Sequence, residues 1–241
     1  LWVGLYGTPA GRGLGVLGRY SPTETAELAA RQALSYQELI SGTQIAVIPF
    51  FHMVTTVSDP FPGADGDYVH RVSTATLTLW IDVASRYDLK SVLDVQPGHS
   101  PITEELTYLE PFLRMKDVHL AVDPEFLMLD GTSVPGSKIG TMNGELLNSV
   151  QSWLNDLAGA VGVRKALIIH QFDDRMFSGK ERIDDYPLVE LVWDADGFGS
   201  PGSKIADYEQ YAGEPGFEHG GFKLFYNYDT PLMTPAQVLD L

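Results

Sequence analysis

Five predicted strands of this 241-residue sequence end on pairs of polar side chains that stand two positions apart. Because successive side chains of a strand alternate between its two faces, both members of each pair share one face. Two carboxyl groups with separated pKa values supply a general acid and a base or nucleophile, the arrangement used in glycoside hydrolysis. The pairs are Asp94 and Gln96, Asp123 and Glu125, Gln171 and Asp173, Asp194 and Asp196, and Asn227 and Asp229.

The pair Asp123 and Glu125 ends the apolar run "HLAVDPEFLM", residues 119–128, which is typical of a buried strand. Glu125 stands last and reaches furthest, so we expect it to be the general acid/base. Asp123 would lie one layer deeper, where it raises the pKa of Glu125 or orients a substrate group. Asp196, or else Asp194, would be the nucleophile or water-activating base across the cavity.

The remaining polar residues near the strand ends suit recognition of a hydroxyl-rich ring through hydrogen bonds and stacking. Lys223 lies on the inward parity of the last strand and is expected to be a partner for the acidic groups. The full set of substrate-binding candidates is Asp94, Gln96, Gln171, Asp173, His52, His99, His170, Tyr6, Asn227, Asp229 and Lys223.

Two other functions fit the same residue types. His52, His99 and His170 fall near strand ends, where they and the aspartates could hold a metal for a hydrolase or lyase acting on phosphoesters or other small molecules. Oxygen-rich ligands would favour Mg²⁺, Ca²⁺ or Mn²⁺ over zinc. Acid/base chemistry by carboxyl groups needs no cofactor, and none is expected for it. The other alternative is a barrel that binds carbohydrate without cleaving it.

The elements that would position these residues alternate along the chain. Apolar runs of strand length occupy 2–7, 44–52, 90–96, 118–125, 165–173, 188–196 and 221–229. Helical patterns separate most of them. "SPTE" at 21–24 and "TPAQ" at 234–237 have the cap, proline and third-position acid or amide that begin a helix.

Alternating strands and helices predict βαβ units and a parallel sheet. The length and the number of repeats favour an α/β fold, a (β/α)7-8 TIM-like barrel that forms one domain over residues 1–241. No eighth strand is visible, so closure is expected to be irregular. Parallel strands deliver their C-terminal ends to one rim, where barrel enzymes place their sites. We therefore expect Asp94, Asp123, Glu125, Asp173, Asp194, Asp196 and Asp229 to gather at one end.

Composition narrows the partners. With 32 acidic and 16 basic residues, the chain should repel nucleic acid, and no apolar run is long enough to cross a bilayer. The sequence lacks cysteine, which excludes a thiol nucleophile. "GLGVLG" at 13–18 matches a dinucleotide-binding spacing, but five residues intervene after Gly7 and the capped helix begins only at Ser21, so we expect a flexible first loop.

In its strand-end acidic groups the chain resembles (β/α)-barrel glycoside hydrolases, several families of which end a strand with D-x-E or D-x-D. That resemblance implies cleavage of a glycosidic bond in an oligo- or polysaccharide. Through "LDVQPG", "AVDPEF", "IIHQF", "DADGFG" and "KLFYNYDTPLMTP", the whole chain also looks like a family of exported bacterial proteins. This second resemblance implies an extracellular or cell-envelope location after removal of an export signal.

Overall fold

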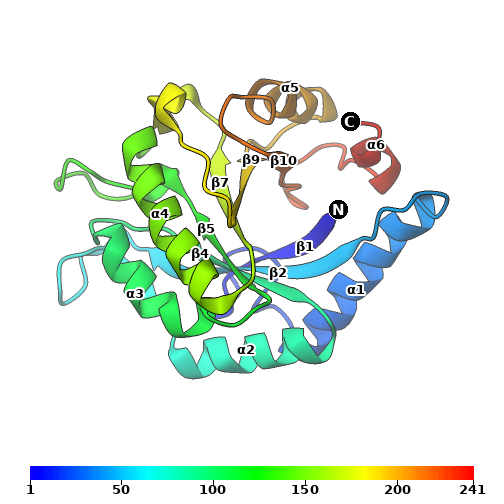
Figure 1. Ribbon diagram of the computed structural model, residues 1–241, viewed down its shortest axis with the longest axis horizontal. Helices are drawn as coiled ribbons and strands as arrows, with labels where there is room; N and C mark the ends of the chain where they lie inside the picture. Colours follow the sequence, from blue (N-terminus) through cyan, green and yellow to red (C-terminus); the bar gives the residue numbers. More distant parts are fainter.

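Seven parallel strands form a strongly curled sheet in the computed structural model, which describes residues 1–241 (Figure 1). Each strand pairs with its neighbours in parallel, and the two end strands do not pair with each other. The result is an open half-barrel, which confirms the predicted α/β, TIM-like fold with irregular closure. In order across the sheet the strands are β1 (Trp2–Gly7), β2 (Ile48–Ser58), β4 (Lys90–Val95), β5 (Val118–Val122), β7 (Lys165–Gln171), β9 (Val189–Ala195) and β10 (His219–Phe222).

Helices follow the strands and surround the sheet on its convex side (Figure 1). They are α1 (Pro22–Leu39), α2 (Thr74–Arg86), α3 (Ile102–Leu113), α4 (Gly144–Val161), α5 (Pro201–Tyr211) and the short α6 (Pro235–Leu239). Single 3₁₀ turns are η1 (Pro124–Phe126), η2 (Asp174–Met176) and η3 (Lys180–Arg182). The short strand β3 (Val69–Arg71) runs antiparallel to β2, and β6 (Met142–Asn143) pairs with β8 (Phe177–Ser178).

Local sequence accounts for the helix ends. Ser21 and Thr234 each form a capping box with the side chain three residues later, as predicted for α1 and α6. Gly162 caps the C-terminal end of α4 in the left-handed conformation, which glycine adopts without a steric penalty. No helix is long and apolar enough to cross a membrane.

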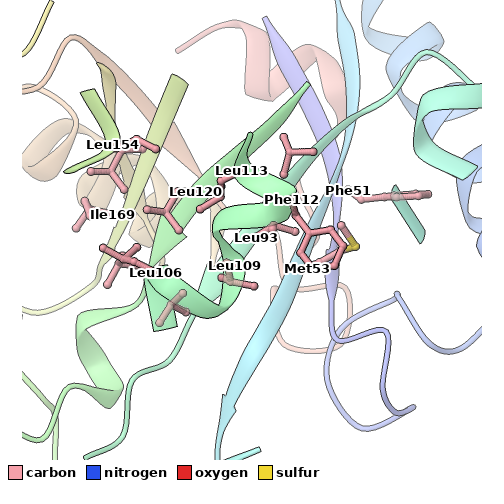
Figure 2. Close-up of a cluster of buried hydrophobic side chains, with 14 of the residues drawn as sticks. Phe51, Met53, Leu93, Leu106, Leu109, Phe112, Leu113, Leu120, Leu154 and Ile169 are labelled. Atoms are coloured by element: carbon pink, nitrogen blue, oxygen red, sulfur yellow. The ribbon is translucent and has the colours of Figure 1, made fainter. Parts of the chain in front are cut away.

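The main hydrophobic core lies between the helices and the convex face of the sheet. Figure 2 shows Leu106, Leu109 and Phe112 of α3 packed against Leu93 and Leu120 of the sheet. These five side chains belong to a cluster of 37 buried residues. Side chains alternate between the two faces along β5 and β7, so odd-numbered and even-numbered residues lie on opposite faces. One set packs against the helices, and the other lies on the concave face.

The opening between β1 and β10 is spanned by side chains. Lys223 Nζ lies 4.0 Å from the centre of the Tyr6 ring, and the Tyr226 hydroxyl donates a hydrogen bond to Gln32 Oε1 at 2.9 Å. The predicted last strand, 221–229, is wrong: the strand ends at Phe222, and the following residues form turns. Without a ladder to continue, this segment folds over the end of the half-barrel.

One predicted strand end also differs from expectation. β2 extends to Ser58, beyond the predicted end at residue 52, because β3 turns back to pair with its second half. The glycine-rich first loop folds back on the end of β1, where the Val16 N–H donates a hydrogen bond to the Tyr6 carbonyl at 2.7 Å. Gly15 has φ of +68°, and a Cβ there would lie 2.1 Å from the Tyr6 carbonyl oxygen, so only glycine fits this approach.

Candidate active site

A buried cluster of histidines and aspartates lies on the concave face near the C-terminal ends of the strands. His170 of β7 is at its centre. His170 Nε2 lies 3.2 Å from Asp94 Oδ2, and His170 Nδ1 lies 3.0 Å from Asp194 Oδ2 and 3.2 Å from Asp196 Oδ2. His52 Nε2 lies 3.0 Å from the same Asp94 oxygen. We call His52, Asp94, His170, Asp194, Asp196 and Lys223 the His170 cluster.

Strand register brings these residues together. His170 pairs with Asp194 across β7 and β9, and the parallel ladder puts both side chains on the concave face. Asp94 is one residue before the end of β4, so it lies near the same rim. The predicted gathering of Asp94, Asp194 and Asp196 at one end of the sheet is therefore confirmed.

Opposite charges favour the ionised forms of Asp94 and His170 despite their burial. Burial alone would raise the pKa of Asp94, but His170 and His52 hold it well below its usual range. Burial alone would lower the pKa of His170, but Asp94, Asp194 and Asp196 raise it well above 6.5. These carboxylates therefore favour the protonated form of His170, which offsets part of the negative charge around it.

Lys223 supplies the second cation. Its Nζ lies 2.6 Å from Asp196 Oδ1 and 2.8 Å from Asp196 Oδ2, with the Tyr6 ring beneath it. Although burial opposes the shift, Asp196 and Asp194 raise the pKa of Lys223. Burial also works against ionisation of Asp196, but Lys223 and His170 lower its pKa. Asp196 is therefore held as a carboxylate, and Lys223 occupies the expected place beside the acidic groups.

Asp123 and Glu125 lie beside this cluster after the end of β5. Asp123 comes just before the turn η1, and Glu125 lies within it. Asp123 Oδ1 accepts a hydrogen bond from the Glu125 backbone N–H at 3.0 Å, and Gln96 Nε2 donates to Asp123 Oδ2 at 3.4 Å. Burial raises the pKa of Asp123 to about 7; His170 opposes this shift, whereas Asp94, Asp196 and Glu125 add to it. Burial and the charge on Asp196 also raise the pKa of Glu125, whose side chain is only partly buried.

Several buried polar atoms of the cluster have no hydrogen bond. They are Asp94 Oδ1, both ring nitrogens of His170, and Asp196 Oδ1, which has only the ion-pair contact with Lys223. The contacts of His170 have ion-pair distances but lack hydrogen-bond geometry. Buried polar groups are nearly always satisfied in proteins, so unused capacity concentrated at one place marks a site that can take a ligand.

Two overlapping groups of donors could hold a metal ion. One consists of His52, Asp94 and His170, and the other of His170, Asp194 and Asp196; within each group the candidate atoms lie within 4.8 Å of one another. Imidazole and carboxylate together suit Mn²⁺, while the two carboxylates of the second group also suit Mg²⁺. His99, the third histidine considered from the sequence, belongs to neither group.

The expectation that Gln171 and Asp173 line the cavity is wrong. In β7 the even-numbered residues face the concave side, so Gln171 points towards the helices, where it accepts a hydrogen bond from Lys180 Nζ at 2.9 Å. Asp173 follows the strand end, accepts a hydrogen bond from the Arg175 backbone N–H and pairs with the Arg175 guanidinium at 2.7 Å. Neither side chain touches the His170 cluster.

Three other candidates also lie apart from the cluster. His99 stacks on Tyr68, and its Nε2 contacts the Ser133 carbonyl at 2.8 Å. Asn227 is exposed in the segment after β10. Asp229 is buried, but both its oxygens accept backbone N–H groups, from Gly199 at 2.8 Å and from Phe225 at 2.7 Å. Asp229 therefore joins two loops.

Two features of the site could not be recognised from the strand-end pairs. The central position of His170 was missed, because the pattern drew attention to its neighbour Gln171. Its one signal in the sequence was its parity with Ala166 and Ile168. The close approach of Tyr6 to Lys223 across the sheet opening had no local signal, because it joins the first strand to the last.

Comparison of the chain with protein-family models finds no matching family, and comparison with curated proteins finds no match.

Proposed function

We propose that this protein hydrolyses glycosidic bonds by carboxyl acid/base catalysis at the C-terminal rim of the half-barrel. The observation that carries the proposal is a pair of carboxyl environments with opposite effects. Burial raises the pKa values of Asp123 and Glu125, whereas Lys223 lowers the pKa of Asp196. Such divergence supplies one group that carries a proton and another that is ionised.

Glu125 is the better candidate for the proton donor. Asp123 is committed to the turn η1, where its Oδ1 accepts a hydrogen bond from the Glu125 backbone N–H while Gln96 donates to its Oδ2. Glu125 is partly exposed, and its carboxyl group has no hydrogen-bond partner within the protein. In the proposed reaction Glu125 protonates the oxygen of the leaving sugar. Asp196 acts on the anomeric carbon, either directly as nucleophile or by taking a proton from the attacking water.

The surrounding residues would position these two groups. Asp94 is fully buried between His52 and His170, so it orients the cluster and does not reach a substrate. Gln96 is likewise committed, since its Oε1 accepts from the Ser58 N–H at 3.2 Å while its Nε2 contacts Asp123. Tyr6, Asp194 and Lys223 are left as the polar groups nearest to a bound sugar.

The test is release of reducing ends from a panel of polysaccharides and their hexaoses that includes glucans, xylan, mannan and chitin. Wild-type protein should cleave at least one of them. Glu125→Gln keeps the size of the side chain but removes its transferable proton, so turnover should fall about 10²–10⁴-fold. The matched control is Glu104→Gln, an exposed position on α3 that should leave turnover unchanged.

Three results would count against the proposal. If Glu125→Gln turns over as fast as the wild type, Glu125 is not the acid, and the role passes to Asp123 or Asp196. If sugars bind without being cleaved, the chain is a carbohydrate-binding barrel. If no member of the panel is cleaved or bound, glycoside hydrolysis is wrong.

A metal-dependent hydrolase is the second candidate, and the unpartnered buried atoms of the cluster favour it. His52, Asp94 and His170 would hold the ion, which could polarise a phosphoester or activate water. Binding of Mn²⁺ to protein treated with EDTA separates the two functions. Calorimetry and electron paramagnetic resonance measure this binding. Stoichiometric binding that His170→Asn abolishes would support the metal-dependent function. A protein that binds no Mn²⁺ but still cleaves a polysaccharide after EDTA treatment excludes it.

A further inference from the structure

A group of aromatic side chains lies exposed beyond the ends of β9 and β10. Phe198 is 67% exposed and Tyr228 is 66% exposed, although both are large apolar rings. Their ring centres are 5.7 Å apart with planes tilted by 45°, and Phe225 lies 5.8 Å from Phe198 and 6.4 Å from Tyr228. We call Phe198, Phe225 and Tyr228 the aromatic platform.

The platform is held in place by its buried surroundings. Asp229 accepts backbone N–H groups from Gly199, next to Phe198, and from Phe225, so one carboxylate ties the two loops together. Beneath Phe225, the ammonium groups of Lys204 and Lys223 lie 5.2 Å and 4.7 Å from its ring centre. Loops tied in this way restrict where the rings can move before a ligand arrives, which reduces the entropic cost of binding.

The platform adjoins the proposed reacting groups. Phe198 comes two residues after Asp196, and Phe225 comes two residues after Lys223. Lys223 connects the two regions physically, because its Nζ lies 2.8 Å from Asp196 Oδ2 and 4.7 Å from the Phe225 ring. A molecule resting on the rings would therefore lie close to the proposed reacting groups.

We propose that the aromatic platform is a sugar-binding subsite that stacks one pyranose ring of the substrate beside the cleaved bond. The proposal rests on the glycosidic function proposed above and specifies where a neighbouring sugar unit lies. A pyranose ring presents an apolar C–H face that packs on an aromatic face, while its hydroxyl groups remain available to polar side chains. The exposed Tyr228 also carries a hydroxyl group that can bind a sugar hydroxyl.

Sugar fits this surface better than a purely apolar ligand does. Lys223 Nζ lies 4.7 Å from the Phe225 ring and pairs with Asp196, so the rings adjoin charged groups that would oppose an apolar chain but can bind hydroxyl groups. The exposed rings also form a small group on turns, whereas a stable protein interface needs a much larger continuous area.

The experiment measures calorimetric binding of cellohexaose, xylohexaose, mannohexaose, maltohexaose and N-acetylchitohexaose to the full chain. The parent is Glu125→Gln, so that no ligand is consumed during the titration. At least one hexaose should bind. Adding Phe198→Ala or Tyr228→Ala should weaken that binding about 10-fold each, the scale expected for losing one buried ring face. Phe198→Tyr should retain it.

The matched control is Phe61→Ala, which removes a ring that is 74% exposed in the loop between β2 and β3. It should leave the dissociation constant unchanged. The platform is refuted if no hexaose binds, if Phe198→Ala and Tyr228→Ala bind as tightly as the parent, or if Phe61→Ala weakens binding equally. Binding that depends on the rings, in a wild-type protein without turnover, supports the platform and refutes hydrolysis. Turnover with a KM that the ring variants leave unchanged supports hydrolysis and refutes the platform.

Discussion

Two groups of buried charges lie near the ends of β2 and β4, and they are built differently. In the first, Glu105 is completely buried and accepts hydrogen bonds from Arg71, from Ser100 at 2.5 Å and from Thr56 at 3.1 Å. Arg71 in turn donates to Asp67 at 2.7 Å. We call these five residues the Arg71 network. In the second, the His170 cluster, Asp94 and His170 are equally buried, yet several of their polar atoms have no hydrogen bond.

The difference separates a structural role from a functional one. A saturated ion pair stabilises only the arrangement that saturates it, because any loosening exposes uncompensated charge. A cluster with unused donors and acceptors gains when a ligand arrives, and until then its charges are only partly compensated. We therefore interpret the Arg71 network as a brace between β3 and α3, and the His170 cluster as the support of the proposed active site.

The largest effect on stability should come from the Arg71 network. Glu105→Ala leaves the Arg71 guanidinium and two hydroxyl groups without their acceptor, so the free energy of unfolding should fall by about 3–5 kcal/mol. Urea denaturation measures it. The matched control is Glu104→Ala, the exposed neighbour on the same helix, which should change the value by less than about 0.5 kcal/mol. Equal losses in the two variants would show that the network is not a brace.

A pH dependence should arise at Asp123. Its pKa of about 7 lies above the value of an unfolded chain, so the folded state binds the proton more tightly. The stability from this group is therefore full below about pH 4 and is lost as the pH rises through about 7. Asp123→Asn mimics the protonated form and removes this dependence.

Urea denaturation at pH 5, 6 and 7 checks the sign. Between pH 5 and 7, the wild type should lose about 2 kcal/mol of unfolding free energy relative to Asp123→Asn. Asp156→Asn, an exposed position on α4, is the control and should run parallel to the wild type. A difference that stays constant with pH would mean that Asp123 is already ionised at pH 5.

A smaller change, of the opposite sign to that at Glu105, should follow from Asp194→Asn. Asp194, Asp196 and Asp94 surround the single His170 ring, so removing one negative charge relieves repulsion among the others. The free energy of unfolding should stay unchanged or rise by about 1 kcal/mol, while any polysaccharide turnover falls. A loss as large as that of Glu105→Ala would place Asp194 in a structural network, and the contrast between the two groups would disappear.

The sequence predicted the rim because its causes are local. Parallel strands bring their C-terminal ends together, so Asp94, Asp194 and Asp196 could be placed on one rim from strand pattern alone. The capped starts of α1 and α6 were predicted for the same reason. These signals need no knowledge of which strands are neighbours.

The parts that failed depend on long-range pairing. β7 is buried on both faces, so its apolar residues do not show which parity faces the concave side, and Gln171 was assigned to the wrong one. The last strand, β10, was predicted to extend too far. An end strand has no partner on one side, so it can stop wherever a turn is stable. The contact of Lys223 with Tyr6 depends on how far the sheet curls, which no local pattern records.

The smallest effect should follow from Asp173→Ala. The sequence pattern placed Asp173 with the reacting carboxylates, whereas the structure pairs it with Arg175, whose side chain is 75% exposed. Arg175 lowers the pKa of Asp173 to about 2. Burial of the Asp173 carboxyl is slight, however, and an ion pair that solvent screens contributes little to folding. The variant should change the unfolding free energy by less than about 1 kcal/mol and leave turnover on any cleaved polysaccharide at the wild-type rate. Turnover measured beside Glu125→Gln provides the comparison, since a loss of 10²-fold at Asp173 would restore it to the site and displace Asp196 as the second carboxylate.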